Sequence, residues 1–258
     1  MTRAVRAELL KLRRPGLLWG SLGALFGFTL LVSILSVATA TETAGARSVS
    51  VARLVAADGL TIGFGNASRL VGLVILTLFL SSVTTEYSLG TIRVLLTRQP
   101  DRITVLGGKL GALLIAMTAA LLAALVLSVA SAGAAMLARG LPVGAWFTGA
   151  GLGHALAGYG NALVACALYG AVGLAFGVLL RSTVLAVGVM LGWFFMAENI
   201  AATDWSGAPH WLPGLLAGVV MTGGTDTVAY RPAFAATLAY LAVAVAVAGV
   251  VFARRDVS

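Results

Sequence analysis

Residues 70–80 read LVGLVILTLFL, a stretch that carries no charge and a single hydroxyl group. Extended outward, the apolar stretch runs roughly from Leu60 to Val83. It is long enough for a helix that crosses a bilayer, which needs about 20 residues. A predominantly apolar run of this length indicates a membrane-spanning helix.

Other parts of the chain repeat this pattern. Apolar stretches of spanning length cover residues 17–38, 105–137, 153–180, 183–198 and 233–252. A proline inside a helix costs about 3 kcal/mol, so prolines mark helix ends. All of them lie outside or at the ends of the six stretches: Pro15, Pro100, Pro142, Pro209, Pro213 and Pro232. We predict an all-α polytopic membrane protein, with residues 1–258 forming one domain of six transmembrane helices.

The composition excludes several classes of protein. Hydrophobic residues make up 60% of the chain, charged residues only 10%, and the mean hydropathy is +1.01. A water-soluble enzyme or a disordered chain would need far more polar residues. The lone Cys166 permits no internal disulfide, and His154 and His210 have no partners at ligand spacing, so we expect no metal site.

The basic residues predict the orientation. The net charge is +8, which we attribute to cytoplasmic loops rather than to a nucleic-acid partner. With the N-terminus inside, 12 of 17 basic residues are cytoplasmic: Arg3, Arg6, Lys11, Arg13, Arg14, Arg93, Arg98, Arg102, Lys109, Arg181, Arg254 and Arg255. The other five are expected outside: Arg47, Arg53, Arg69, Arg139 and Arg231. Both termini are therefore expected in the cytoplasm, and the first apolar run is expected to be a retained span.

The N-terminal segment, residues 1–15, has the pattern of a helix at the inner membrane interface. Met1, Val5, Leu9 and Leu12 form one apolar stripe, and the basic residues lie away from it. One interpretation places the stripe in lipid and the arginines at anionic headgroups. The other is a basic flank without a partner of its own.

Between the second and third spans lies the most informative loop. Residues 84–104 predict a short amphipathic helix, in which Leu89, Ile92 and Leu96 share one face. A loop that only reversed the chain would need just a few residues. An apolar stripe in a cytoplasmic loop indicates either a docking partner or contact with lipid alone.

This loop resembles a motif of the type-2 ABC transporter permease family. The resemblance is carried by Glu86, Tyr87, Gly90, Thr91, Ile92, Arg93, Leu95 and Leu96, followed by Pro100, Arg102 and Lys109. Weaker similarities are the opening run from Glu8 to Arg14, the turn Leu180-Arg181-Ser182 and the pair Leu212-Pro213. Their order and the number of spans match the family over the whole chain.

The resemblance implies a permease subunit of a bacterial plasma membrane that has no ATPase activity of its own. Two permease subunits, identical or different, would pair with two cytoplasmic ATP-binding subunits among membrane lipids. The chain itself would bind no cofactor, since ATP and Mg²⁺ would lie on the partner. Residues 84–104 would be the coupling helix, and residues 199–232 would form outer re-entrant half-helices. The expected ATPase-coupling residues are Glu86, Tyr87, Gly90, Thr91, Ile92, Arg93, Leu95, Leu96 and Arg102.

Three polar side chains are candidates for a transport path. Glu198 ends the fifth span, where it either serves transport or lies at the outer interface. Asn161 and Tyr159 lie in the fourth span; Asn161 either lines a path or bonds a neighbouring helix.

Glycine pairs four residues apart recur in the predicted spans. Such pairs let helices approach closely in lipid, either inside one bundle or at a subunit interface. They are Gly16/Gly20, Gly23/Gly27, Gly107/Gly111, Gly149/Gly153, Gly173/Gly177 and Gly188/Gly192.

Taken together, these observations predict the permease of an ATP-driven exporter that moves an amphipathic or hydrophobic cargo such as a drug, antibiotic, peptide or lipid. No phosphate-binding loop of the G-x-x-x-x-G-K-[ST] type is present, so the energy would come from another chain. The alternatives are a secondary transporter driven by an ion gradient and a membrane scaffold that transports nothing. A secondary transporter would favour carboxylates in the middle of several spans.

Overall fold

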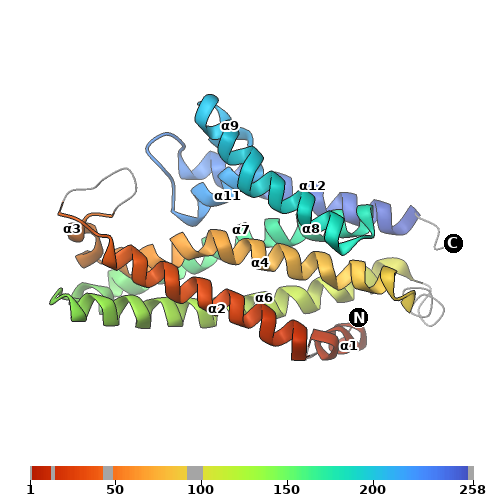
Figure 1. Cartoon of the computed structure of the whole chain (residues 1–258), viewed down its shortest axis with the longest axis horizontal. Helices are drawn as coiled ribbons and strands as arrows, with labels where there is room; N and C mark the ends of the chain where they lie inside the picture. Colours follow the sequence, from red (N-terminus) through yellow and green to blue (C-terminus); the bar gives the residue numbers. More distant parts are fainter. Residues whose placement is uncertain (1, 13–14, 43–48, 92–100, 255–258) are drawn as a thin grey trace.

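The computed structural model describes residues 2–12, 15–42, 49–91 and 101–254, and these form an elongated helical bundle without strands (Figure 1). Six helical segments of this part are long and apolar enough to cross a membrane, which confirms the all-α, six-helix prediction. The long helices are α2 (Pro15–Ala38), α4 (Gly59–Ser88), α6 (Arg102–Ala138), α7 (Gly149–Leu180) and α12 (Tyr230–Arg254), and the remaining span is a composite of three pieces.

The composite fifth span extends from Thr183 to Asp204. It begins with α8 (Thr183–Leu191), continues through the π-helix η2 (Gly192–Ala197) and ends with α9 (Glu198–Asp204). It is longer than the stretch of residues 183–198 predicted from hydropathy, and a segment with two short helices follows it before α12. The two short helices are α10 (Ala208–Trp211) and α11 (Pro213–Met221).

Helices α4 and α7 form the centre of the bundle. More than half of the 18-residue apolar stretch that marks each span is buried, 56% in α4 and 61% in α7, against 11% in α12. Glycine permits the close approach: a Cβ added at Gly173 of α7 would stand 2.4 Å from the backbone oxygen of Leu76 in α4. A Cβ added at Gly177 would likewise crowd the backbone oxygen of Leu80 in α4. This pair therefore packs inside the bundle, as one of the two interpretations predicted.

Other glycine pairs face open space. A Cβ at Gly16, Gly20, Gly23 or Gly27 of α2 would meet no atom within 4 Å, and the same holds for Gly188 and Gly192 in the fifth span. The single chain leaves these surfaces of α2 and the fifth span uncovered.

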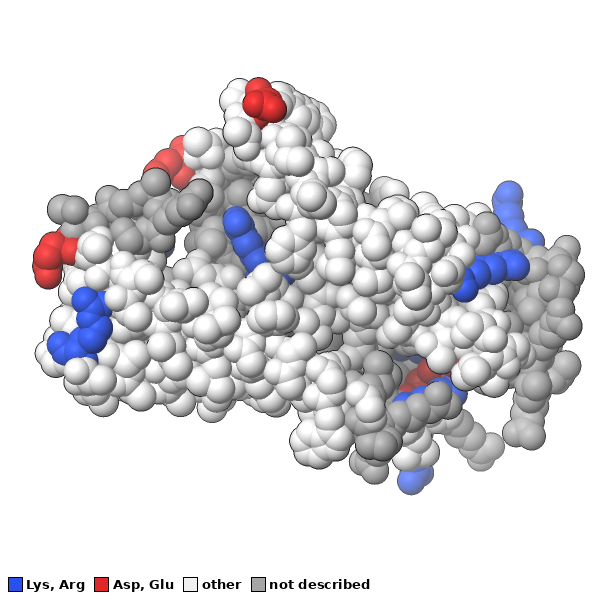
Figure 2. All heavy atoms as spheres, viewed as in Figure 1, with Lys and Arg blue, Asp and Glu red and all other residues white. Residues whose placement is uncertain are grey.

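The two chain ends lie at the same end of the bundle (Figure 1). Helix α1 (Thr2–Leu12) packs beside α6 at this end, and the short helices α3 (Val51–Val55) and η1 (Gly144–Phe147) lie toward the other. Charged side chains gather toward the two ends in Figure 2 and are sparse across the middle. This distribution is the one expected of a bundle whose middle crosses a membrane.

Candidate functional site

A buried cluster of four charged side chains joins three helices at the end of the bundle that holds the termini. Lys109 Nζ of α6 donates to Glu8 Oε2 of α1 at 2.8 Å and lies 3.1 Å from Glu86 Oε1 of α4. Lys11 Nζ of α1 donates to Glu8 Oε1 at 2.5 Å and to Glu86 Oε1 at 2.6 Å. Two lysines and two glutamates thus form a neutral ring of ion pairs, which we call the charge cluster.

Burial makes this cluster energetically important. The side chain of Lys109 is only 5% exposed, and those of Glu8 and Glu86 are 11% and 12% exposed, while Lys11 is 38% exposed. The third donor hydrogen of Lys109 also has a partner, because Nζ donates to the backbone oxygen of Ser82 at 3.1 Å. A buried charge is tolerated only when it is paired and hydrogen-bonded in this way.

Local helix geometry brings the members together. Glu8 and Lys11 are three residues apart, so they lie on one face of α1. That face packs on α6, where Val5 Cγ2 would stand 3.4 Å from a Cβ at Gly111. At Val5, the apolar stripe of α1 therefore contacts α6.

The pKa values of the α1 members follow from these contacts. Burial alone would raise the pKa of Glu8, but the ammonium groups of Lys109 and Lys11 outweigh it and hold that pKa below its ordinary value. Burial would likewise lower the pKa of Lys11, and hydrogen bonds to Glu8 and Glu86 reverse this and raise it. Both groups are therefore charged over a wide range of pH around neutrality.

The turn that leaves α4 contains three of the predicted coupling residues. Tyr87 lies in the last turn of α4, and the guanidinium carbon of Arg181 stands 5.2 Å from its ring centroid, within cation–π range. Gly90 has φ +65°, a left-handed conformation that favours glycine after a helix end. The hydroxyl of Thr91 donates to the backbone oxygen of Glu86 at 3.4 Å. The motif residues here build the helix end itself.

The remaining predicted coupling residues have no described side chains. Residues 92–100 lie outside the described part of the chain, and with them Ile92, Arg93, Leu95 and Leu96. Arg102 is described only as the first residue of α6. The predicted coupling segment 84–104 overlaps the ends of two long helices, since α4 continues to Ser88 and α6 begins at Arg102.

Glu198 is buried, with 1% of its surface exposed. Its Oε1 accepts from Trp193 Nε1 at 2.9 Å and from the Gly214 backbone nitrogen at 3.1 Å, and its Oε2 accepts from the Leu215 nitrogen at 2.9 Å. The two backbone donors belong to the first turn of α11, where a negative charge is favoured by the helix dipole. The carboxylate thus caps α11 and connects the fifth span to that helix.

The other two transport-path candidates lie apart from Glu198. Asn161 Oδ1 accepts from the hydroxyl of Tyr230 in α12 at 2.7 Å, a bond between helices. Asn161 also lines a polar cavity of about 820 Å³, together with Asn66 and His154. The hydroxyl of Tyr159 donates to the backbone oxygen of Thr118 in α6 at 2.8 Å. Of the three candidates, Asn161 lines this cavity, whereas Glu198 and Tyr159 do not.

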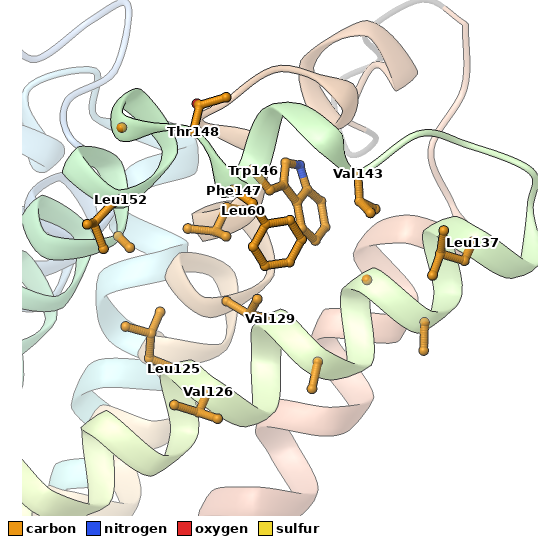
Figure 3. Close-up of a pocket in the computed structure, with 15 residues that line it drawn as sticks. Leu60, Leu125, Val126, Val129, Leu137, Val143, Trp146, Phe147, Thr148 and Leu152 are labelled. Atoms are coloured by element: carbon orange, nitrogen blue, oxygen red, sulfur yellow. The ribbon is translucent and has the colours of Figure 1, made fainter.

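A larger apolar recess lies between α6, η1 and the start of α7 (Figure 3). It encloses about 880 Å³, and its labelled walls include Val129, Leu137, Val143, Phe147 and Leu152. Trp146 is 1% exposed and donates through Nε1 to the backbone oxygen of Leu54 at 2.8 Å. This hydrogen bond holds η1 against α3. The recess itself presents an apolar surface to the outside of the bundle.

Sequence reasoning missed two features. It did not pair Glu8 with Lys109, because the two helices are distant in sequence and the apolar stripe of α1 drew attention to lipid. It also assigned Arg69 to an outer segment, whereas the residue lies within the transmembrane helix α4. A charge inside an apolar span was the signal that could have identified Arg69. Among the described residues, no group of three His, Cys, Asp or Glu side chains is arranged to hold a metal ion.

Comparisons with known proteins add no assignment. No model of a protein family matches the chain, and no curated protein matches it either.

Proposed function

We propose that the chain is the membrane-spanning permease subunit of an ATP-driven exporter of the ABC type. Its cargo would be an amphipathic or hydrophobic compound, and the ATP would be hydrolysed on a separate cytoplasmic subunit. The observation that carries the proposal is the charge cluster, which joins α1 to the end of α4 and to the first turns of α6. The motif that resembles the ABC permease family occupies the same loop.

The geometry suits the transmission of a mechanical force. A partner that pushed on the loop between Ser88 and Arg102 would act on the ends of α4 and α6 together. The charge cluster ties these two ends to α1, so the three helices would move as one unit. Because α4 is packed along its length on α7, this movement would reach the centre of the bundle.

The proposal requires this end of the bundle to be cytoplasmic. Single cysteines in a Cys166→Ala background test the orientation with a membrane-impermeant maleimide applied to intact cells. We expect labelling at Ser206, in the outer connection, and none at Ser88 until the membrane is permeabilised. Labelling of Ser88 in intact cells would reverse the orientation.

Docking of an ATPase is tested at the apolar stripe of the loop. Affinity-tagged chain from membranes of its native host is expected to co-purify with a subunit that hydrolyses Mg-ATP. Burial of an apolar side chain contributes roughly 1.5–3 kcal/mol, so Ile92→Asp with Leu96→Asp should remove that activity. The matched control, Ile92→Leu with Leu96→Ile, keeps the stripe apolar and should keep the ATPase. Wild-type ATPase yield with the double aspartate variant would show that this stripe is not the docking site.

The main alternative is a transporter driven by an ion gradient. Such a protein would need a titratable group that is free to bind the ion. The carboxylate of Glu198 instead accepts three hydrogen bonds, one from the Trp193 side chain and two from the backbone of α11. Everted membrane vesicles distinguish the two functions. Export that stops without ATP but continues with a protonophore supports the exporter, and the opposite result supports the alternative.

A further inference from the structure

The cavity that Asn66, His154 and Asn161 line is polar, unlike the apolar recess of Figure 3. It encloses about 820 Å³, within the range of roughly 300–1,000 Å³ that small-molecule sites occupy. Its walls come from α3 and the turn after it, the first turns of α4, the first half of α7, and the connection between α11 and α12. This polar cavity therefore lies at the end of the bundle opposite the charge cluster (Figure 1).

Two glycines let the helices that line the polar cavity pack closely. A Cβ added at Gly158 of α7 would stand 3.1 Å from Thr61 Cγ2 of α4, so these two helices are in contact along the cavity. A Cβ added at Gly65 of α4 would stand 3.3 Å from the backbone oxygen of Met221, the last residue of α11. Helix α4 is thus the element that contacts both α7 and α11 here.

The connection between α11 and α12 is held in place by its own hydrogen bonds. The backbone nitrogen of Gly224 donates to the oxygen of Val219 at 2.9 Å, and that of Thr225 donates to the oxygen of Val228 at 3.0 Å. Gly223 and Gly224 have φ of +77° and +112°, a region that favours glycine. Contacts within the chain therefore define the walls, as in a largely pre-formed binding site.

Two amide side chains in the polar cavity have hydrogen-bonding capacity to spare. Asn66 Nδ2 donates to Ser36 Oγ at 3.2 Å, but no group of the described residues donates to its Oδ1. Asn161 Oδ1 accepts from the hydroxyl of Tyr230 at 2.7 Å, but its Nδ2 has no acceptor among the described residues. The cavity thus offers one acceptor from α4 and one donor from α7. A hydroxyl group satisfies either, because it both donates and accepts.

The charged residues give the polar cavity a negative balance. Those that line it within the described ranges are Arg53, Asp58 and Asp226, and their formal charges sum to −1 with His154 neutral. Arg53 Nε is 3.1 Å from Asp58 Oδ2, so these two charges offset each other. The carboxylate that remains is Asp226, in the connection between α11 and α12. A cleft with one net sign of charge attracts ligands of the opposite sign.

We propose that the polar cavity binds a small, water-soluble amine that also carries hydroxyl groups. Its ammonium group lies at Asp226, and its hydroxyl groups bond Asn66 Oδ1 and Asn161 Nδ2. Binding needs no ATP and no second protein, so the proposal does not rest on the proposed function. Loss of ATPase docking in the loop variants would leave it intact.

Equilibrium binding to the purified full-length chain tests the charge of the ligand. The measurement is made at low ionic strength, where exposed charges are screened least. The probes are glucamine, sorbitol and gluconate, which share one polyol chain and end in an ammonium, a hydroxyl and a carboxylate group. We expect glucamine to bind roughly three- to fivefold more tightly than sorbitol, as for one exposed charge pair, and gluconate to bind more weakly than either.

Variants at Asp226 assign the preference for the ammonium group. Asp226→Asn should abolish the difference between glucamine and sorbitol, while unchanged sorbitol binding shows that the variant is folded. The matched control is Asp204→Asn, at an exposed carboxyl of α9 that does not line the polar cavity, and it should keep the difference. A preference for glucamine that survived Asp226→Asn would overturn the assignment of the ammonium group to this carboxylate.

A second pair of variants tests the hydroxyl groups. Asn66→Ala should weaken glucamine and sorbitol alike by roughly three- to tenfold, the loss expected for one hydrogen bond. Ser36→Ala removes the partner of Asn66 Nδ2 without changing a residue that lines the polar cavity, and it should bind both probes normally. Equal losses in the two variants would mean that Asn66 serves the packing of α4 on α2 and not the ligand.

Filling the polar cavity tests the location of the site. Ala157 lines it, whereas its neighbour Leu156 is 65% exposed and does not. Ala157→Phe should therefore remove binding of glucamine and sorbitol, and Leu156→Phe should leave both unchanged. Normal binding by Ala157→Phe would place the site elsewhere on the chain.

Two results with the wild type would overturn the proposal itself. One is equal binding of glucamine and sorbitol, or tightest binding of gluconate, because either result excludes recognition of an ammonium group. The other comes from nanodiscs of phosphatidylcholine with and without phosphatidylethanolamine, whose headgroup carries a free ammonium. Weaker glucamine binding in the presence of phosphatidylethanolamine would assign the polar cavity to a lipid headgroup, whereas equal binding supports a water-soluble amine.

Discussion

The ammonium group of Lys109 lies 2.8 Å from a carboxylate oxygen of Glu8, although 101 residues separate the two along the chain. The contact joins the N-terminal helix to the start of the third span. Since Lys109 also contacts Glu86, each charge of the cluster has a neighbour of opposite sign on another helix. Four predictions follow from the contacts of this cluster and of the bundle behind it.

Removal of Lys109 should destabilise the protein more than removal of Lys11. Loss of one partner from a buried ion pair costs roughly 3–5 kcal/mol, whereas exposed pairs contribute about 1 kcal/mol or less. We therefore expect Lys109→Met to lower the free energy of unfolding several-fold more than Lys11→Met, whose side chain is 38% exposed. Unfolding in detergent micelles measures both. Equal losses would mean that the two lysines share the same environment in solution.

The stabilisation by the cluster should depend on pH at both extremes. The pKa of Glu8 is held below its ordinary 4.5, so its contribution is present above pH 4.5 and is lost as the pH falls through the folded-state pKa. The pKa of Lys11 is raised above 10.5, so its contribution is present below pH 10.5 and is lost as the pH rises through the folded-state pKa.

Comparison of the wild type with Glu8→Gln measures the acid side. The free energy of unfolding of the wild type should exceed that of Glu8→Gln by a constant amount between about pH 5 and 10. This difference should shrink below pH 4.5, the ordinary pKa of a glutamate. Glu42→Gln, at an exposed carboxyl outside the cluster, is the control. A difference that persisted unchanged to pH 2 would contradict the charge-based account.

Glu198→Gln should loosen the attachment of α11 to the fifth span. The amide carries one oxygen in place of two, so the donors at Gly214 and Leu215 can no longer both be satisfied. Hydrogen bonds to a charged group contribute about 1.5–3 kcal/mol each, and Trp193→Phe, which removes one donor only, should cost less. Hydrogen exchange of residues 213–221 measures the effect. Normal protection in Glu198→Gln, combined with altered export, would assign Glu198 to the transport path instead.

Gly173→Ala should disrupt the contact between α4 and α7. The added Cβ would stand 2.4 Å from the Leu76 backbone oxygen, and such overpacking costs about 1–3 kcal/mol or more. At Gly188, where a Cβ meets open space, alanine should be neutral or stabilise the helix by up to about 1 kcal/mol. Thermal unfolding of the two variants provides the comparison. If Gly188→Ala were the more damaging variant, a partner must cover that surface.

The spans could be predicted from sequence because each depends on a local property. About 20 consecutive apolar residues must cross the bilayer, and residues such as Leu70 and Leu80 report that requirement directly. The fifth span was predicted too short because Glu198 and Asn199 were taken to end it, whereas the carboxylate is satisfied by donors from α11 and the helix continues to Asp204.

The charge cluster could not be predicted in the same way. Glu8, Glu86 and Lys109 are brought together only after three helices have packed, and no periodicity within α1 indicates which residues of α6 will face it. Arg69 was misplaced for a different reason: counting charges by loop assigns every arginine to a loop, although α4 carries this one inside the span.

The cap on α11 has a consequence for the order of assembly. Glu198 is synthesised 16 residues before Gly214, one of its donors. At about 5–20 residues per second, the carboxylate exists for roughly one to three seconds before that donor has been made. Until residues 214 and 215 have been made, the carboxylate lacks two of the three donors that it has in the folded chain. The fifth span therefore reaches its final hydrogen bonding only after residues 199–215 have been synthesised and α11 has folded against it.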